Sequence, residues 1–160
     1  ANNGNESLVV WQANSQVFGA RVRNDGVVLD SPGVQISSTG SQVFPAVACS
    51  SADYLVVWEH LPSGQTASDI RGARVSLANV PGPEFTISAA INNERTPAVA
   101  AIGSDYFVVW EDNRIGPDPD VFGARVTAAG VSAPIEVSRV VGGQFAPAIT
   151  AVNFSLRIWV

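Results

Sequence analysis

The sequence predicts an all-β fold of tandem four-stranded antiparallel repeats, arranged like the blades of a β-propeller. Three observations support this prediction. The four tryptophans recur 47, 52 and 49 residues apart, and each ends a short apolar run. A Gly-Ala-Arg-Val motif and a Pro-Ala motif recur with nearly the same period. Apolar residues alternate over short stretches, which is typical of strands and too brief to sustain helices.

Each repeat is about 50 residues long and contains four strand signals in a fixed order. The first is a Pro-Ala segment of small residues, at Pro45, Pro97 and Pro147. The second is the aromatic and β-branched run that packs well on a pleated sheet, at Leu8–Trp11, Leu55–Trp58, Phe107–Trp110 and Leu156–Trp159. The third is the glycine motif, which starts at Gly19, Gly72 and Gly123. The fourth brackets an apolar residue with polar ones, at Gln35–Ser37, Thr86–Ser88 and Glu136–Ser138.

The repeats divide one domain, 1–160, into segments of about 1–42, 43–94 and 95–143, with a partial segment at 144–160. In a propeller the crowded Pro-Ala strand is innermost and the polar fourth strand is at the rim. Three repeats and a fraction are fewer than the four to eight blades that close a ring. We therefore expect a fragment of a larger ring, or a homodimer that completes one. The alternative is a three-repeat β-trefoil or β-prism.

Composition excludes several classes of partner. The chain is 46% apolar and 14% charged, as expected of a globular domain. It has no lysine and a net charge of −5, so it lacks the basic surface that nucleic-acid binding requires. No stretch approaches 18 consecutive apolar residues, so we expect no contact with a membrane.

The repeat pattern resembles a known class of protein. The segments Pro45–Ala48 and Pro97–Ala100, followed by Trp110–Asp112 and the glycine motif, are similar to the tandem repeats of about 50 residues found in bacterial secreted and cell-surface proteins. Those repeats are taken to be propeller blades. The resemblance implies a propeller scaffold and an extracellular or cell-surface location, but it transfers little chemistry because one scaffold serves many functions.

The most polar stretch connects the second and third strands of the third repeat, and it contains the candidate metal ligands. Asp112, Asp118 and Asp120 present carboxylates, and Asp118 and Asp120 have the alternating spacing that oxygen-ligated Ca²⁺ sites use. No cofactor is required by the sequence, and Ca²⁺ is the one that these residues suggest. The competing interpretation is structural: the aspartates cap turns, while Glu59 pairs with Arg74 and Glu111 with Arg125 across the hairpins.

Candidate ligand-binding residues lie in the same polar connections. They are Asp112, Arg114 and His60, the last of which we expect on a surface loop. We predict no catalytic residue, because the sequence has no nucleophile elbow, phosphate loop, dinucleotide fingerprint or zinc spacing.

Two functions remain open. The favoured one is a non-enzymatic extracellular binding or scaffold module, whose variable loops present polar side chains to a glycan or a protein. The alternative is part of a propeller-type glycan-active hydrolase or lyase. Carboxylates from several repeats that converge on one cleft would favour the enzyme.

Overall fold

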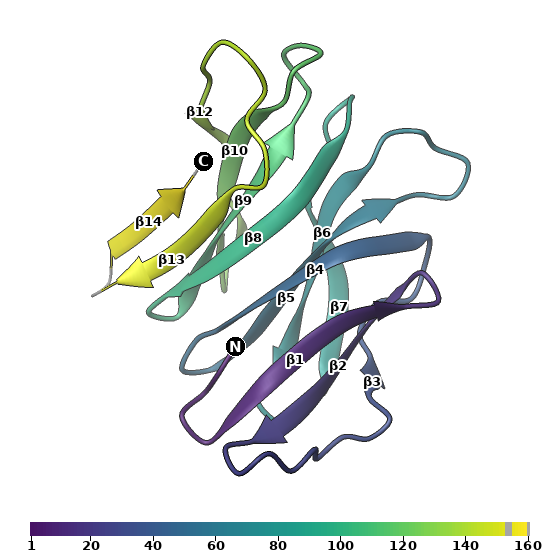
Figure 1. Cartoon of the computed structure of the whole chain (residues 1–160), viewed down its shortest axis with the longest axis vertical. Helices are drawn as coiled ribbons and strands as arrows, with labels where there is room; N and C mark the ends of the chain where they lie inside the picture. Colours follow the sequence, from purple (N-terminus) through teal and green to yellow (C-terminus); the bar gives the residue numbers. More distant parts are fainter. Residues whose placement is uncertain (153–154, 160) are drawn as a thin grey trace.

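The computed structural model describes residues 1–152 and 155–159, which form four antiparallel sheets in sequence order (Figure 1). The first sheet contains β1 (Glu6–Ala13), β2 (Gln16–Arg23) and β3 (Val34–Gln35). The second contains β4 (Ser41–Cys49), β5 (Asp53–Leu61), β6 (Asp69–Ser76) and β7 (Pro81–Ser88). The third contains β8 (Glu94–Ile102), β9 (Asp105–Asp112), β10 (Asp120–Thr127), β11 (Gly130–Val131) and β12 (Ile135–Ser138). The last pairs β13 (Ala148–Val152) with β14 (Ser155–Trp159).

This arrangement confirms the predicted fold class. The second sheet has the order β4–β5–β6–β7, which is the order of the four sequence motifs. Each repeat forms its own sheet, as in a propeller. Residues 153, 154 and 160 of the expected partial repeat lie outside the described residues. Among the described residues, no helix is long and apolar enough to cross a membrane.

The sheets stack through their innermost strands and their faces. Figure 1 shows β1, β4, β8 and β13 side by side, and neighbouring members of this series are in contact. One apolar core lies between the first and second sheets, and a second core lies between the second and third. Each sheet therefore hides its faces against its neighbours, which accounts for most of the burial.

The apolar run of β5 shows why this sequence signal is continuous instead of alternating. Tyr54, Val56 and Trp58 point into the core shared with the first sheet. Leu55 and Val57 point into the core shared with the third sheet. A strand that is buried on both faces carries apolar residues at every position, because successive side chains point to opposite faces.

A backbone hydrogen bond links successive sheets at the same place in each repeat. The donor is the backbone amide of a buried polar residue, three positions before the proline of the Pro-Ala motif. The acceptor is the carbonyl of the residue just before the strand with the glycine motif in the preceding repeat, which is β2, β6 or β10. The pairs are Gln42 with Ser15, at 3.0 Å, Glu94 with Ser68, at 2.9 Å, and Gln144 with Pro119, at 2.8 Å. We call these bonds the inter-sheet bridges.

The glycine of the third-strand motif permits close approach of the neighbouring strand. A Cβ atom added at Gly72 would lie 2.9 Å from the Val56 carbonyl oxygen and 3.1 Å from Cδ1 of Ile87. One added at Gly123 would lie 3.0 Å from the Val108 carbonyl oxygen. The motif therefore recurs for a steric reason.

We expect Gly72→Ala to lower the free energy of unfolding by about 1–3 kcal/mol, because the added methyl group overpacks a backbone contact. Urea unfolding would measure the change. Gly116→Ala is the matched control, since a Cβ there meets nothing within 4 Å. Equal midpoints for Gly72→Ala and the parent chain would contradict the steric account.

The expected pairing of two chains stays a prediction. Trp58 and Trp110 are fully buried, whereas Trp159 on β14 is 63% exposed. β14 pairs only with β13 among the described strands, and an unpaired strand edge is a template for another chain. Light scattering should give twice the mass of one chain, and a monomer at all accessible concentrations would reject the pairing.

Candidate functional site

The candidate site is a hollow of about 280 Å³ where the innermost strands begin. It is lined by two adjacent residues from each of three successive repeats, namely Phe44 and Pro45, Thr96 and Pro97, and Ala146 and Pro147. We call it the central concavity, because β4, β8 and β13 lie side by side beneath it (Figure 1). It is thus built by the repeat itself.

The backbone of the central concavity is strained in the same way in each repeat. Phe44, Thr96 and Ala146 have φ values of 51°, 46° and 49°. The left-handed region costs a residue with a side chain about 1–2 kcal/mol. In β4 and β8 the pairing register shifts across this point, as in a β-bulge. The bulges turn backbone N–H groups away from the sheet ladder, where side chains of the preceding repeat can reach them.

Two glutamates approach these amides from the preceding repeats. Oε1 of Glu111, on β9, accepts a hydrogen bond from the Ala146 amide at 2.7 Å. Glu59, at the equivalent place on β5, lies beside the Thr96 amide. Its Oε2 atom is buried and has no hydrogen-bond partner. The repeat therefore brings a carboxylate of one sheet to a backbone amide at the central concavity in each of two successive repeats.

Glu59 titrates differently from an exposed glutamate. Burial raises the pKa of Glu59 above its usual value, and the nearby charge of Glu111 acts in the same direction. The Ser68 hydroxyl, the Thr96 amide and the Arg95 guanidinium oppose this rise and only partly offset it. Glu59 thus holds its proton to a higher pH than an exposed glutamate does.

Such an arrangement can perform acid and base chemistry. A carboxyl group with a raised pKa can donate a proton to a leaving oxygen, while a second carboxylate activates water or attacks directly. Glu59 suits the first role because it is partly desolvated. Glu111 suits the second, because a backbone amide holds its carboxylate in place.

These positions correct the predicted cross-strand pairs. Arg74 pairs with Asp53 at 2.8 Å, not with Glu59. Arg125 pairs with Asp105 at 2.7 Å, not with Glu111. The prediction was wrong because the arginines reach along the sheet toward the start of the second strand, while the glutamates reach into the next repeat.

A second polar group, the buried carboxylate cluster, lies next to the central concavity. It contains Ser88, Glu94, Trp110, Asp112 and Arg114. The side chains of Glu94 and Asp112 are fully buried. Arg114 bridges them, with Nη2 2.9 Å from Oε1 of Glu94 and 2.6 Å from Oδ2 of Asp112. Its guanidinium also lies over the ring of Phe122, with 4.3 Å between Cζ and the ring centroid.

The two buried carboxyl groups titrate in opposite directions. Burial raises the pKa of Glu94 to about 7, and contact with Asp112 adds to the rise. Burial also pushes the pKa of Asp112 upward, but the bonds from Arg114 and Trp110 outweigh it and hold that pKa below its usual value. One proton is therefore retained on Glu94 near neutral pH while Asp112 stays ionised.

This geometry places the predicted ligand-binding residues. Asp112 and Arg114 do lie together, but they are engaged with each other, and Arg114 is the more exposed. The prediction for His60 is wrong in its location: His60 is 5% exposed on β5, and not on a surface loop. Its Nδ1 atom lies 2.9 Å from Oε1 of Gln42. His60 and Gln42 occupy in the second sheet the places of Asp112 and Glu94 in the third.

The three predicted metal ligands do not form one cluster. Asp112 is bound by Arg114, Asp118 is exposed, and Asp120 is buried opposite Asp112 in the β9–β10 ladder. Among the described residues no group of three or more His, Cys, Asp and Glu side chains is placed to hold a metal ion. The Ca²⁺ site stays a prediction, which the described geometry does not support.

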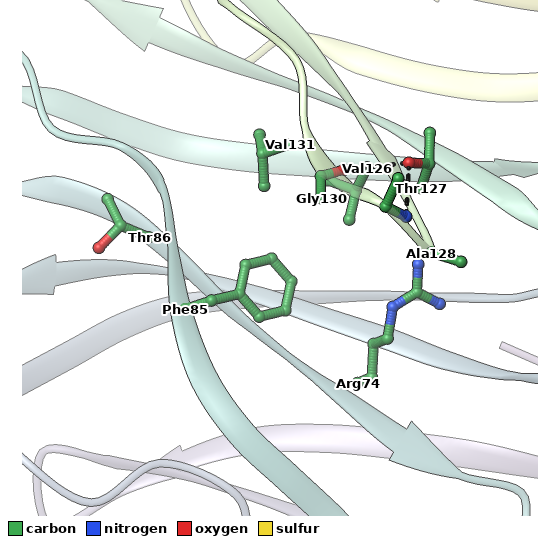
Figure 2. A pocket seen from close by; sticks show the side chains of 9 residues that line it. Arg74, Phe85, Thr86, Val126, Thr127, Ala128, Gly130 and Val131 are labelled. Atoms are coloured by element: carbon green, nitrogen blue, oxygen red, sulfur yellow. Dashed lines mark hydrogen bonds between the residues drawn. The ribbon is translucent and has the colours of Figure 1, made fainter.

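A hollow at the periphery lacks comparable chemistry. Figure 2 shows Arg74 and Phe85 facing Val126, Thr127 and Val131 across a space of about 300 Å³. Arg74 is already paired with Asp53, and no carboxylate lines this space. The hollow therefore offers an apolar gap between two sheets.

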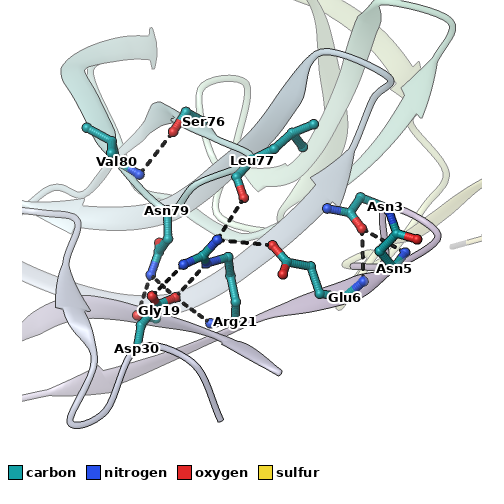
Figure 3. A network of polar contacts seen from close by, with 10 residues as sticks. All are labelled: Asn3, Asn5, Glu6, Gly19, Arg21, Asp30, Ser76, Leu77, Asn79 and Val80. Atoms are coloured by element: carbon teal, nitrogen blue, oxygen red, sulfur yellow. Dashed lines mark hydrogen bonds and ion pairs between the residues drawn. The ribbon is translucent and has the colours of Figure 1, made fainter. Parts of the chain in front are cut away.

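A polar network serves to join the first and second sheets (Figure 3). Arg21 donates two bonds of 2.8 Å to Asp30 and one of 3.3 Å to Glu6. Asn79, which is 3% exposed, donates to Asp30 and to the Gly19 carbonyl. Oδ1 of Asn79 has no hydrogen-bond partner among the described residues, but the charged groups pair with one another, so the network is a structural link.

Sequence reasoning did not find the central concavity. Glu59 and Glu111 stood out in the repeat but were interpreted as structural, and Arg95 was not singled out at all. The available signal was the repeat itself, because the position of Arg95 carries Val43 and Phe145 in the other copies. A charged residue at an otherwise apolar repeat position was a reason to examine it.

Comparison with known proteins adds a likeness of fold. No family model and no curated protein matches the sequence. Among solved structures, the chain is similar to a GH43 endo-arabinanase from Bacillus licheniformis, with a TM-score of 0.57 and 12% sequence identity. The match covers 96% of this chain and 60% of that enzyme, a five-bladed β-propeller. The chain thus has the fold of a partial propeller and spans about 60% of the length of the enzyme.

The raised pKa of Glu94 predicts how stability depends on pH. Between 4.5, its ordinary pKa, and about 7, the folded chain binds more protons than the unfolded chain. Its contribution to stability is therefore complete below pH 4.5 and is lost as pH rises through 7, by on the order of 3 kcal/mol.

Glu94→Gln should flatten this dependence, because glutamine, which occupies the equivalent positions 42 and 144, does not titrate. Urea unfolding at pH 4.5, 6 and 7.5 would measure it. Glu136→Gln, at an exposed site, is the control and should keep the slope of the parent chain. An unchanged slope in Glu94→Gln would refute the assignment.

Proposed function

We propose that the chain is part of a propeller-type glycan-active hydrolase, with the central concavity as its reaction site. The observation that carries the proposal is that Glu59 and Glu111, from neighbouring repeats, each approach the backbone amide of a residue that lines the central concavity, Thr96 and Ala146. Convergent carboxylates were the feature expected to distinguish an enzyme from a scaffold. The likeness to an endo-arabinanase supports the choice of glycan chemistry at the level of fold.

In this proposal the two glutamates have different roles. Glu59 donates its proton to the glycosidic oxygen as the bond to the anomeric carbon breaks. Glu111 either accepts a proton from the attacking water or attacks the anomeric carbon itself.

A second candidate function is sugar binding without turnover. Phe44, at the rim of the central concavity, is 59% exposed beside Pro45. An exposed ring next to prolines gives a flat apolar surface that can cover the C–H face of a sugar. Binding of a polysaccharide with no release of product would favour this function.

We expect Glu59→Gln and Glu111→Gln each to slow glycan cleavage by about 100-fold or more, because each removes a group that transfers a proton in the reaction. The measurement is release of reducing ends from arabinan first, and then from other plant and bacterial polysaccharides. Glu136→Gln, which lies outside the central concavity, should leave the rate unchanged. Parent-level rates in both glutamate variants would reject the proposed roles.

The pH profile gives an independent test of the acid. A general acid works only while it is protonated, so the rate should fall as pH rises through the raised pKa of Glu59. The residual rate of Glu59→Gln should lack this alkaline limb. The proposed role fails if the limb persists in the variant.

A further inference from the structure

A polar groove beside the central concavity supplies no reacting group to the proposed catalysis, although its Arg95 acts on the pKa of Glu59. It has a volume of about 470 Å³ and lies between the loop that precedes β8 and the loop that follows β9. Its lining is mostly polar and consists of Asn92, Asn93, Arg95, Asn113, Gly116 and Pro117. No carboxylate lines it. In a chain with a net charge of −5, a groove whose only charge is positive is unusual.

Arg95 is the feature of the polar groove that requires explanation. Seven other arginines form ion pairs with carboxylates, namely Arg21, Arg23, Arg71, Arg74, Arg114, Arg125 and Arg139. Arg95 is exposed and forms no ion pair or hydrogen bond with any described residue. Glu111 is opposite Arg95 in the β8–β9 ladder, but its carboxylate accepts from the Ala146 amide instead.

The amides of the polar groove are held in position. The Asn93 carbonyl accepts from the Asn113 amide at 3.0 Å, and Nδ2 of Asn92 donates to the Asn113 carbonyl at 3.0 Å. Nδ2 of Asn113 donates to the Pro117 carbonyl at 2.9 Å. These bonds tie the two loops together, so a ligand meets walls that are already ordered and pays little entropy to fix them.

Comparison of the repeats shows that the fold does not require an arginine at position 95. Residues that recur in every repeat, such as the glycine of the third strand, serve the fold. At this position the other repeats carry Val43 and Phe145, so the fold does not need a cation there. The charge belongs to the third repeat alone, where the polar groove lies.

We propose that the polar groove binds a sugar unit that carries a carboxylate, a uronic acid, next to the bond cleaved in the central concavity. A guanidinium binds carboxylates through two parallel hydrogen bonds, and asparagine amides both donate to and accept from sugar hydroxyls. Arg95 precedes Thr96, which lines the central concavity, so adjacent sugar units of one chain would occupy both places. This inference deepens the proposed function. It rests on that function only in placing the cleaved bond next to the bound uronic acid.

The test is binding of trigalacturonate to the whole chain, monitored by the shifts of the protein's backbone amide NMR signals. The methyl ester of trigalacturonate is the control, because it has the same sugar chain without the negative charges. We expect trigalacturonate to shift the signals of Asn92, Asn93 and Asn113, and to bind at least about tenfold more tightly than the ester. Arg95→Gln should weaken binding by about tenfold or more. Arg23→Gln, an exposed arginine of the first repeat, is the control and should bind like the parent chain.

The proposal is overturned if acid and ester bind equally, if Arg95→Gln binds like the parent chain, or if no binding occurs. A sulfated trisaccharide that binds where the uronate does not would overturn the assignment to a carboxylate. Binding does not depend on cleavage, so it is distinguishable from the proposed activity. Uronate binding without hydrolysis of any glycan would support the groove and reject the hydrolase.

Discussion

The inter-sheet bridges are the constraint on which the rest of the structure depends. In three successive repeats the amide of a buried polar residue, Gln42, Glu94 or Gln144, bonds to a carbonyl of the preceding repeat. Apolar packing between sheets is non-directional and would tolerate sliding, whereas a buried amide must find its acceptor or lose its hydrogen bond. The bridges therefore fix the register of each sheet against the next. The left-handed residue two positions after each bridge donor, Phe44, Thr96 or Ala146, is consequently presented to the preceding sheet at a constant place.

The candidate site is a consequence of this register. Glu59 and Glu111 occupy equivalent positions in two repeats and both reach toward the bulge of the next one. A single sheet has one such glutamate, so it cannot form a pair of carboxylates by itself. The polar groove differs from the scaffold in a comparable way, because Arg95 occupies a repeat position at which the other repeats carry the apolar residues Val43 and Phe145. The proposed reacting groups thus come from two different repeats, and the proposed determinant of ligand specificity, Arg95, lies where one repeat differs from the others.

Much of the fold follows from the sequence because periodicity and burial are local signals. The run Leu55–Trp58 identifies a strand buried on both faces, and the recurrence of Gly72 marks a close contact. The site follows less readily, because its geometry depends on which way a side chain leaves its strand. The cross-strand pairs expected for Glu59 and Glu111 were wrong, since hairpin spacing cannot show that a bulge in the next repeat offers a free amide. His60 was misplaced because its strand extends two residues beyond the apolar run that marks it.

The central claim is that carboxylates of neighbouring repeats share one site, and carboxyl carbon NMR titration tests it most directly. The account predicts that Glu59 titrates above the range of an exposed glutamate, and that Glu111→Gln lowers the pKa of Glu59 by removing a nearby negative charge. A normal pKa for Glu59, or one that does not respond to Glu111→Gln, would contradict the account.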